Sequence, residues 1–245
     1  MIKIKKEDFW KVRSELYNCL SWVKDNSYLN DYIRLGDFKK SDRVLDVGTG
    51  TGVVADAIAP LVKEVVGLDS CKHMLSKGNW IGNKKCVNED IRNTSFDDYS
   101  FDKVSARMVF HHILENTEKA MSECFRVLKK NGKIILAEGV PPIREVKKDY
   151  EEIFKLKEDR LTFLEDDLVK LMMNAGFKVK VYPHVIEKFS VRNWLENSGL
   201  EKEKRDRIFE MHVTSNNIFK KAYNMKIVNG DCLIDTKNLI LVGKK

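Results

Sequence analysis

The stretch that most constrains what this chain can fold into is VLDVGTGTGVVADAI, residues 44–58, in which three glycines fall within five positions. In the interior of an element, a glycine costs roughly 0.5–1 kcal/mol relative to alanine, so Gly48, Gly50 and Gly52 mark a sharp turn or a close approach to the backbone. The apolar run 43–47 before them predicts a buried parallel strand, and the apolar spacing of 53–61 predicts a helix. The glycines therefore form a strand-to-helix turn, whose free N–H groups suit a nucleotide-like ligand.

The spacing of these glycines excludes two common phosphate-binding turns. Counted from Gly48, the dinucleotide fingerprint G-x-G-x-x-G requires a third glycine where the chain has Val53. The phosphate loop G-x-x-x-x-G-K-[ST] fails because no lysine followed by serine or threonine closes the segment. What remains is a strand containing Asp46, then three glycines at alternate positions, then a helix.

This pattern resembles the first motif of the class I S-adenosylmethionine-dependent methyltransferases, and the resemblance continues in order over about residues 40–140. VVGLDSCKHML (65–75) is similar to the family's second strand, which ends in an acidic residue, and NEDIRNTSF (88–96) to its acidic loop after the third strand. FDKVSARMVFHHI (101–113) and ECFRVLKKNGKIILAEG (123–139) resemble the fourth strand and the helix–turn–strand that ends in the fifth. Within this family the chain is similar to the broad group of small-molecule methyltransferases that includes the ubiquinone- and menaquinone-pathway enzymes.

Short apolar runs alternate with helical segments, which predicts βαβ units and an α/β fold in one domain, residues 1–245. The resemblance implies a Rossmann-like seven-stranded sheet, mostly parallel with an antiparallel last strand, helices on both faces and a helical cap over the active site. We expect the core at about 37–143, 171–188 and 227–245, and the cap at about 1–36, 144–170 and 189–226. Strands are predicted near 43–47, 64–68, 84–88, 101–106, 133–138, 177–182 and 238–243.

Two segments of the expected cap carry apolar residues at helical spacing. The stripe near the N-terminus, expected to face the core, consists of Phe9, Val12, Leu16, Leu20 and Val23. A second amphipathic helix is predicted over 208–222. In similar methyltransferases such helices shape the substrate pocket, for which the candidate residues here are Trp10, Tyr17, Glu138 and Arg192.

The resemblance implies a set of residues for the cofactor, S-adenosylmethionine. Gly48, Thr49, Gly50 and Gly52 let the backbone pass against its methionine moiety and ribose, and Asp46 accepts hydrogen bonds from the turn and positions the ammonium end. Asp69, 17 positions after Gly52, binds the ribose hydroxyls, with Ser70 beside it as a possible helix cap. The remaining candidates are Asp90 and Ile91 for the adenine, Arg107 for the methionine end or for a surface ion pair, and Met74 as a cofactor contact or core residue.

The segment FHHI, residues 110–113, follows the fourth strand, where the family places residues that face the transferred methyl group. Adjacent residues on a helical turn point about 100° apart, so we expect only one of His111 and His112 to face the site. His112 is the favoured candidate, as a general base or as a group that orients the nucleophile. The structural alternative is a satisfied histidine that bridges the loop to the cap.

The sequence predicts no metal site. The fourth strand ends in SARM without the carboxylate that magnesium-dependent methyltransferases carry there. Five cysteines are scattered without any C-x-x-C pair, which argues against a zinc site and a disulfide framework and favours reduced thiols.

The net charge of +7 comes from lysines spread along helices and interleaved with acids, as in KLKEDR (155–160) and EKEKRDR (201–207), which we interpret as solvated helical faces. The charge thus favours a small-molecule methyl acceptor over nucleic acid. The alternatives are a tRNA or protein methyltransferase and, outside catalysis, a cofactor-binding subunit.

Without a signal peptide or an apolar run of 18 residues, we expect a cytoplasmic protein. The acceptor, the atom methylated (N, O, S or C) and the oligomeric state stay open.

Overall fold

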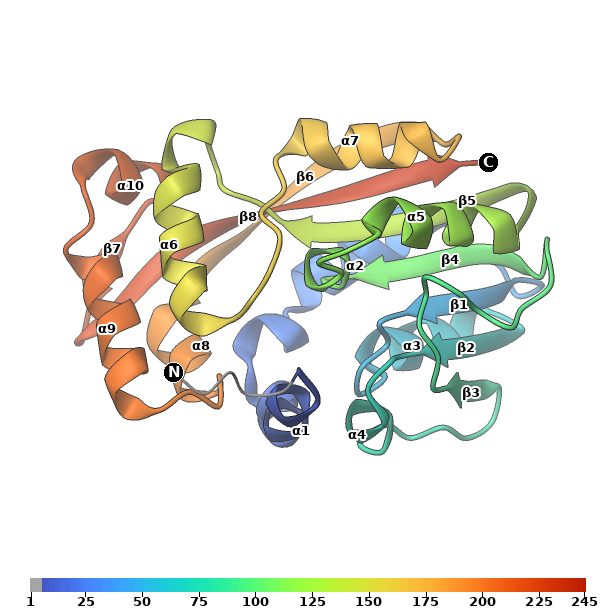
Figure 1. Cartoon of the computed structure of the whole chain (residues 1–245), viewed down its shortest axis with the longest axis horizontal. Helices are drawn as coiled ribbons and strands as arrows, with labels where there is room; N and C mark the ends of the chain where they lie inside the picture. Colours follow the sequence, from blue (N-terminus) through green and yellow to red (C-terminus); the bar gives the residue numbers. More distant parts are fainter. Residues whose placement is uncertain (1–5) are drawn as a thin grey trace.

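The computed structural model describes residues 6–245, and in this range eight strands form one mixed sheet (Figure 1). The strand order is β3-β2-β1-β4-β5-β8-β6, and β7 pairs with the beginning of β8. Strands β1 to β5 pair in parallel, whereas β8 is antiparallel to both β5 and β6. The expected sheet with an antiparallel last strand is confirmed, and the short β7 is an addition. The strands are β1 Arg43–Val47, β2 Glu64–Leu68, β3 Lys84–Val87, β4 Phe101–Arg107, β5 Leu128–Gly139, β6 Lys178–Ser190, β7 Lys226–Val228 and β8 Asp231–Lys244.

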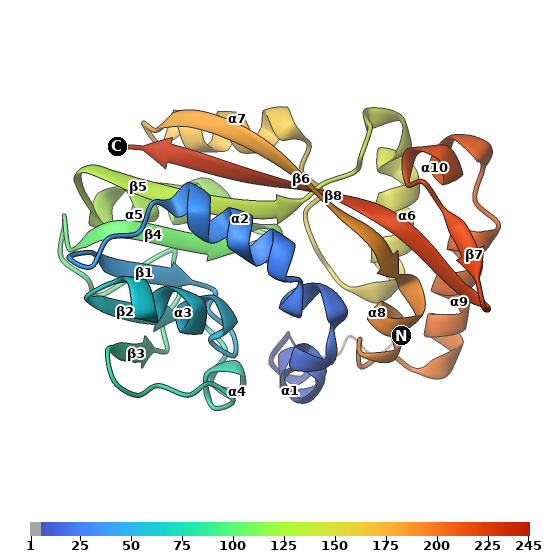
Figure 2. The ribbon, with the colours of Figure 1, turned by 180° about the vertical axis from the view of Figure 1, so that it is seen from behind.

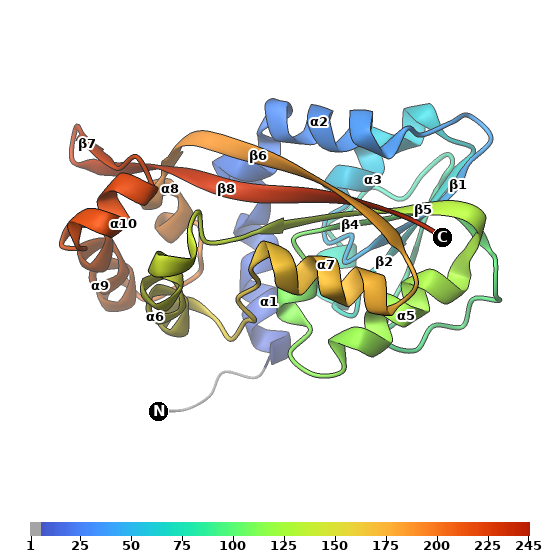
Figure 3. The ribbon, with the colours of Figure 1, turned by 90° about the horizontal axis from the view of Figure 1, so that it is seen from above.

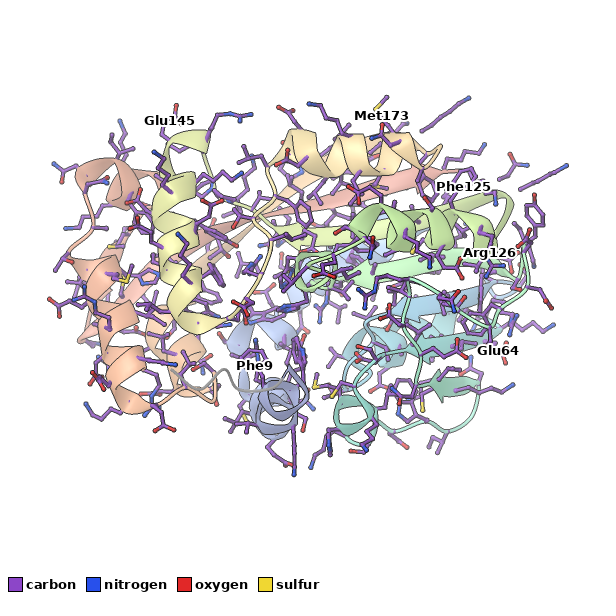
Figure 4. All side chains as sticks on the ribbon, viewed as in Figure 1. Phe9, Glu64, Phe125, Arg126, Glu145 and Met173 are labelled. Atoms are coloured by element: carbon purple, nitrogen blue, oxygen red, sulfur yellow. The ribbon has the colours of Figure 1, made fainter. Side chains whose placement is uncertain are left out.

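Helices cover both faces of the sheet, as the view from above shows (Figure 3). One face packs against α5 (Thr117–Val127) and α7 (Glu165–Asn174), the other against α2 (Asn26–Gly36) and α3 (Val53–Ile58). Because both faces are covered, β1 and β2 are buried along almost their whole length, which accounts for their mainly apolar sequences. Side chains fill the space between the layers, while Met173 points away from the sheet on the outer side of α7 (Figure 4).

Helix α2 belongs to the sheet layer, although we expected all of residues 1–36 in the cap. Its residues Tyr28 and Tyr32 are fully buried. The Tyr32 hydroxyl lies 2.8 Å from the Ser105 hydroxyl and donates to the Ile135 carbonyl at 2.8 Å, so it joins the helix to β4 and β5. Helix α7 also packs on the sheet, which removes residues 165–170 from the expected cap.

Beyond the body of the sheet, β6 and β8 continue as a twisted two-stranded ribbon to the cap helices (Figure 2). The cap has its own apolar cluster, in which Trp194, Ile208 and Phe219 are buried. Its helices are α6 Lys147–Lys157, α8 Val191–Glu196, α9 Lys202–Val213 and α10 Asn217–Ala222, and α1 Lys6–Leu16 lies between them and α4 Lys72–Leu75. Short 3₁₀ helices are η1 Tyr17–Cys19, η2 Ser21–Lys24, η3 Ala59–Leu61, η4 Phe110–His112 and η5 Arg144–Val146. Among the described residues, no helix is both long and apolar enough to cross a membrane.

Helix α1 is rotated relative to the face that its apolar stripe predicts. Val12, expected in the core, is 51% exposed, whereas Arg13 is only 5% exposed. The Arg13 guanidinium lies 5.0 Å from the Trp10 ring centroid and forms an ion pair with Glu158. The charge pairing and the cation–π contact thus orient this helix against its apolar pattern.

The predicted amphipathic helix over 208–222 is wrong as a single element. The chain forms α9 and then α10, and the Asn216 side chain caps α10 by accepting from the Phe219 N–H at 2.8 Å. Ile218, an apolar residue within the predicted range, is exposed. An Asn N-cap satisfies a backbone donor that a continuous helix would use internally, which explains the interruption.

Candidate functional site

A cavity of about 210 Å³ opens where the parallel strands β1, β2, β4 and β5 end. The loops after these strands line it from the sheet side, through residues such as Gly48, Asp69, Val109 and Val140. Helices α1 and α6 and the cap ribbon line it from the other side. The carboxyl edge of a parallel sheet, near a reversal of strand order, is where ligands bind in open α/β folds.

The glycine turn forms the sheet-side wall of the cavity. Gly48, Gly50 and Gly52 have φ values of +62°, +58° and +85°, a region that side chains rarely occupy. A Cβ added to Gly48 would lie 2.3 Å from Val109 Cγ2. The glycine at this position is therefore required by the close approach of the loop after β4. Gly48 and Gly50 line the cavity, whereas Gly52 lies at the N-cap of α3.

Asp46 supports the turn from behind, as expected from a carboxylate within an apolar strand. Its carboxylate accepts hydrogen bonds from Thr49 Oγ1 at 2.6 Å and from Ser105 Oγ at 2.7 Å. Burial raises the pKa of Asp46 to about 6. Asp46 and Thr49 line a small recess of about 10 Å³ next to the main cavity.

Asp69 connects the end of β2 to the glycine turn. One carboxylate oxygen accepts from the Gly50 N–H at 2.9 Å and the other from the Cys71 N–H at 2.8 Å. Asp69, Ser70 and Met74 all line the main cavity. Cys71, not Ser70, occupies the N-cap position of α4.

Asp90 and Ile91 line the same cavity from the loop after β3. Ile91 is buried, while Asp90 is partly exposed and pairs with Arg92 at 2.6 Å. Both residues therefore line the cavity that contains the glycine turn and Asp69.

Arg107 ends β4 with its side chain turned inward. It is 6% exposed, and its Nη1 atom has no hydrogen-bond partner among the described residues. The guanidinium carbon lies 5.7 Å from the Trp22 ring centroid and 5.8 Å from that of Tyr28. The alternative of a surface ion pair is thus wrong, and Arg107 lines the small recess beside Gly48.

His111 and His112 both line the main cavity, which corrects the expectation that only one of them could face it. Their ring centroids lie 4.0 Å apart. Both residues belong to the 3₁₀ turn η4, in which adjacent residues point about 120° apart, so the two rings reach one cavity because they bend toward each other and not because their backbone positions share a direction. Burial and the neighbouring Arg160 hold the pKa of His111 well below its usual range, and burial and His111 do the same for the pKa of His112.

Glu138, which we expected in the substrate pocket, lies behind His111 and is completely buried. One oxygen lies 2.5 Å from His111 Nδ1, and the other accepts from the backbone N–H groups of Val109 at 3.0 Å and Phe110 at 2.6 Å. Burial raises the pKa of Glu138 to about 7. Its position makes it a support for the histidine turn.

Sequence reasoning missed a buried charged cluster, which we call the cap cluster: Arg13, Lys157, Glu158 and Arg160. We had interpreted residues 155–160 as a solvated helical face, but α6 ends at Lys157 and the chain then turns into the cavity. One signal was available, because Lys157 follows Tyr150, Ile153 and Phe154 at helical spacing and so falls on their apolar face.

The cap cluster is held together by direct pairing. Glu158 Oε2 accepts from Arg13 and from Lys157 Nζ, the latter at 2.6 Å, and Arg160 Nη1 lies 3.6 Å from Glu158 Oε1. Burial opposes the charge on Glu158, but Lys157 and Arg13 together hold its pKa well below its usual range. Burial, followed by Arg13, lowers the pKa of Lys157 to about 7.

His111, His112 and Glu158 bring three potential metal-donor atoms within 4.8 Å of one another. Glu158 already accepts from Arg13 and Lys157, so a metal cation would compete with two positive side chains for the same carboxylate. The donor geometry allows a cation, and the surrounding charge opposes it.

Of the other three candidates for the substrate pocket, two line the main cavity and one does not. Trp10 and Tyr17 line the main cavity. Arg192 does not, because its exposed side chain donates to the Gly230 carbonyl at 2.5 Å and lies 5.0 Å from the Phe209 ring centroid, in the outer part of the cap.

Comparison with known proteins agrees with this geometry. Residues 45–136 match the family described as "Methyltransferase domain". An uncharacterized methyltransferase, YcgJ, from Bacillus subtilis is 31% identical over 53% of this chain and 53% of its own length. A demethylmenaquinone methyltransferase from Clavibacter sepedonicus is 28% identical over 64% of this chain and 65% of its own length. The alignments thus span about half to two thirds of these relatives.

Solved structures share the fold over most of the chain. A putative methyltransferase from Bacillus halodurans superposes with a TM-score of 0.80 at 24% identity, covering 90% of this chain and 99% of its own. A phosphoethanolamine N-methyltransferase from Haemonchus contortus, solved with phosphomonomethylethanolamine and S-adenosylhomocysteine, has a TM-score of 0.67 at 18% identity, covering 100% of this chain and 61% of its own.

The fold is therefore that of the class I, Rossmann-like methyltransferases. Residues 45–136 carry the sequence features of the methyltransferase domain, and the solved Haemonchus contortus structures with this fold hold S-adenosylhomocysteine or S-adenosylmethionine.

Proposed function

We propose that this protein transfers a methyl group from S-adenosylmethionine to a small-molecule acceptor. The observation that carries the proposal is one cavity that joins the glycine turn and Asp69 to the histidine pair and to the cap. The cofactor supplies an activated methyl group on a sulfonium, which a nucleophile displaces in line. The protein's part is to bind both molecules, orient the nucleophile and exclude water.

The sheet side of the cavity is the proposed cofactor end. Asp69 takes the ribose hydroxyls, while the Gly48–Gly52 turn gives the chain space beside the ligand. Asp90 and Ile91 hold the adenine. The buried Arg107 Nη1, which has no hydrogen-bond partner in the described part of the chain, fits the carboxylate of the methionine moiety, since a buried donor without an acceptor is costly.

The cap side is the proposed acceptor end. His112 faces the cavity and, with a lowered pKa, is a neutral acceptor at pH 7 that can take or orient a proton of the nucleophile. Trp10 packs edge-on against the His112 ring with a centroid distance of 4.7 Å, which restrains the imidazole. An acceptor site enclosed by α1 and α6 supports a small molecule over a tRNA or a protein.

Calorimetry with S-adenosylhomocysteine tests the cofactor end. Asp69→Ala should weaken binding of S-adenosylmethionine and S-adenosylhomocysteine alike, because both share the ribose. Asp69→Asn separates the roles, since the amide keeps an acceptor for one backbone N–H but loses the charge. Asp97→Ala, an exposed aspartate elsewhere on the surface, is the control. Unchanged affinity in Asp69→Ala contradicts the assignment.

Incubation with labelled cofactor and a metabolite extract, followed by mass spectrometry of labelled products, tests the activity. A labelled small molecule is the expected result. Tight cofactor binding without any labelled product would favour the cofactor-binding subunit, and label on RNA or protein would favour the macromolecular alternatives.

A further inference from the structure

The cap cluster has more positive than negative charge, although it is buried. The side chains of Arg13, Lys157, Glu158 and Arg160 are each no more than 7% exposed. Two arginines face one carboxylate, so the balance is +1 before Lys157 is counted. Taking an uncompensated charge out of water is expensive, and it is expected only where something else supplies the opposite charge.

Two guanidinium nitrogens in this cluster are buried without a hydrogen-bond partner among the described residues: Arg13 Nε and Arg160 Nη2. The longer contact of Arg160 with Glu158, 3.6 Å, is beyond a good hydrogen bond. A buried donor with nothing to bind is costly, and Arg160 lines the cavity.

Aromatic rings hold the Arg160 guanidinium in a fixed orientation. Its central carbon lies 4.2 Å from the Phe154 ring centroid and 5.4 Å from that of Tyr150. The Nε atom donates to the Leu161 carbonyl at 3.3 Å. A guanidinium stacked in this way has a fixed planar edge on which Nη2 has no partner among the described residues, and such an edge matches a carboxylate or phosphate group.

The rest of the acceptor end is aromatic. The cavity is also lined by Trp10, Phe189, Trp194, Phe219 and Tyr223. Aromatic walls favour a flat apolar body, and Arg160 and Arg13 favour a negatively charged group attached to it.

We propose that the methyl acceptor carries an oxyanion on a flat apolar body and that Arg160, with Arg13 and Lys157 nearby, binds this oxyanion. The identification of this ligand as the methyl acceptor rests on the proposed function. The oxyanion site itself does not, because it follows from the residues of the cavity. The competing occupant is a metal ion on His111, His112 and Glu158. The charge of the arginines favours the anion.

Calorimetry on the full chain, with and without saturating S-adenosylhomocysteine, tests the proposal with small probes. Benzoate and phenyl phosphate represent the two oxyanions, and benzamide is the neutral isostere of benzoate. We expect at least one anion to bind tenfold or more tightly than benzamide. The stronger of the two anions identifies the oxyanion as carboxylate or phosphate.

Arg160→Met keeps the apolar stem on Phe154 and removes the charge. It should lower the affinity for the preferred anion at least tenfold and leave the affinity for S-adenosylhomocysteine unchanged, which also shows that the variant folds. Lys155→Met, an exposed lysine on the neighbouring helix α6, is the control and should change neither affinity.

Three results would overturn the inference: equal binding of benzoate, phenyl phosphate and benzamide; no binding of either anion; or unchanged anion affinity in Arg160→Met. A fourth is tight binding of Zn²⁺ alone that His112→Ala abolishes, which would assign the cluster to a cation. If Arg160→Met does not fold, the wild-type comparison of benzoate with benzamide decides. Failure of the wild type to bind S-adenosylhomocysteine, with anion selectivity intact, would contradict the proposed function and not this inference.

Discussion

The imidazole of His111 and the carboxylate of Glu138 lie 2.5 Å apart in the interior, His111 from the turn after β4 and Glu138 from near the end of β5. The other oxygen of Glu138 accepts from two backbone N–H groups of the same turn. One carboxylate thus fixes the conformation of the histidine turn and contacts Nδ1 of His111. Of the two ring nitrogens, Nε2 is the one that Glu138 does not contact. The placement of both histidines in the cavity depends on this contact.

Glu138→Ala should destabilise the protein by about 3 kcal/mol, because it leaves two buried N–H groups and an imidazole nitrogen without their acceptor. Glu138→Gln keeps an acceptor for the backbone and should cost less. Urea unfolding measures both, with the exposed Glu187→Ala on β6 as the control. Equal stability of Glu138→Ala and Glu187→Ala would show that the contact is dispensable.

Gly48→Ala tests the close approach at the glycine turn, and Gly82→Ala is its matched control. The two glycines have nearly the same φ, +62° and +65°, but an added Cβ overlaps Val109 only at position 48 and meets no atom within 4 Å at position 82. We expect Gly82→Ala to lose about 1 kcal/mol from backbone strain alone. Gly48→Ala should lose more and bind S-adenosylhomocysteine at least tenfold more weakly. Similar losses of stability in the two variants would show that the overlap of the added Cβ with Val109 has no effect.

His112→Ala should lower kcat by roughly 10²-fold if the imidazole accepts a proton, with cofactor affinity little changed. Since the pKa of His112 lies below its usual value, the imidazole is already neutral at pH 7. Raising the pH above 7 therefore deprotonates no further His112, and kcat should not increase for that reason. Steady-state kinetics over this range provides the measurement. Near-normal turnover would assign the residue to structure, and an equal effect of His111→Ala would leave the choice between them unsupported.

Methyl transfer should survive excess EDTA, because the carboxylate of Glu158 is already paired with Arg13 and Lys157. The assay is run with and without chelator, and then with added Mg²⁺ or Zn²⁺. Loss of activity that one of these metals restores would show that the His111, His112 and Glu158 cluster holds a catalytic cation.

Lys157→Met should flatten the pH dependence of stability in the alkaline range. Burial lowers the pKa of Lys157 from 10.5 to about 7, so between these pH values the unfolded chain binds a proton that the folded chain does not. The stability of the wild type should therefore rise with pH over this range, by up to about 3 kcal/mol between pH 7 and pH 9.5 at about 1.4 kcal/mol per pH unit. Urea unfolding at the two pH values, with Lys155→Met as the control, measures the difference. An identical slope in wild type and Lys157→Met would contradict the shift.

The sheet and the glycine turn could be predicted because their signals are local. The apolar runs of β1, β2 and β4 and the alternate glycines define strand, turn and helix from residues adjacent in sequence. Asp69 and Asp90 were implied by the resemblance, and both line one cavity because parallel strands end at one edge of the sheet and carry their next residues to one place. The lengths of β6 and β8 did not follow, because the ribbon pairs the two strands over segments with no regular apolar pattern.

The sequence by itself thus determined the order of the elements and the conformation of the turn, and the cofactor was indicated only by the resemblance. Tertiary structure alone decided which face of each helix is turned inward. It brought Arg13 to Glu158 across 145 positions of sequence and seated α2 on the sheet through Tyr32. Periodicity defines the faces of a helix but not the partner that each face meets, and a charged side chain such as Arg13 stays on an inward face only because the opposite charge, Glu158, comes from another part of the chain.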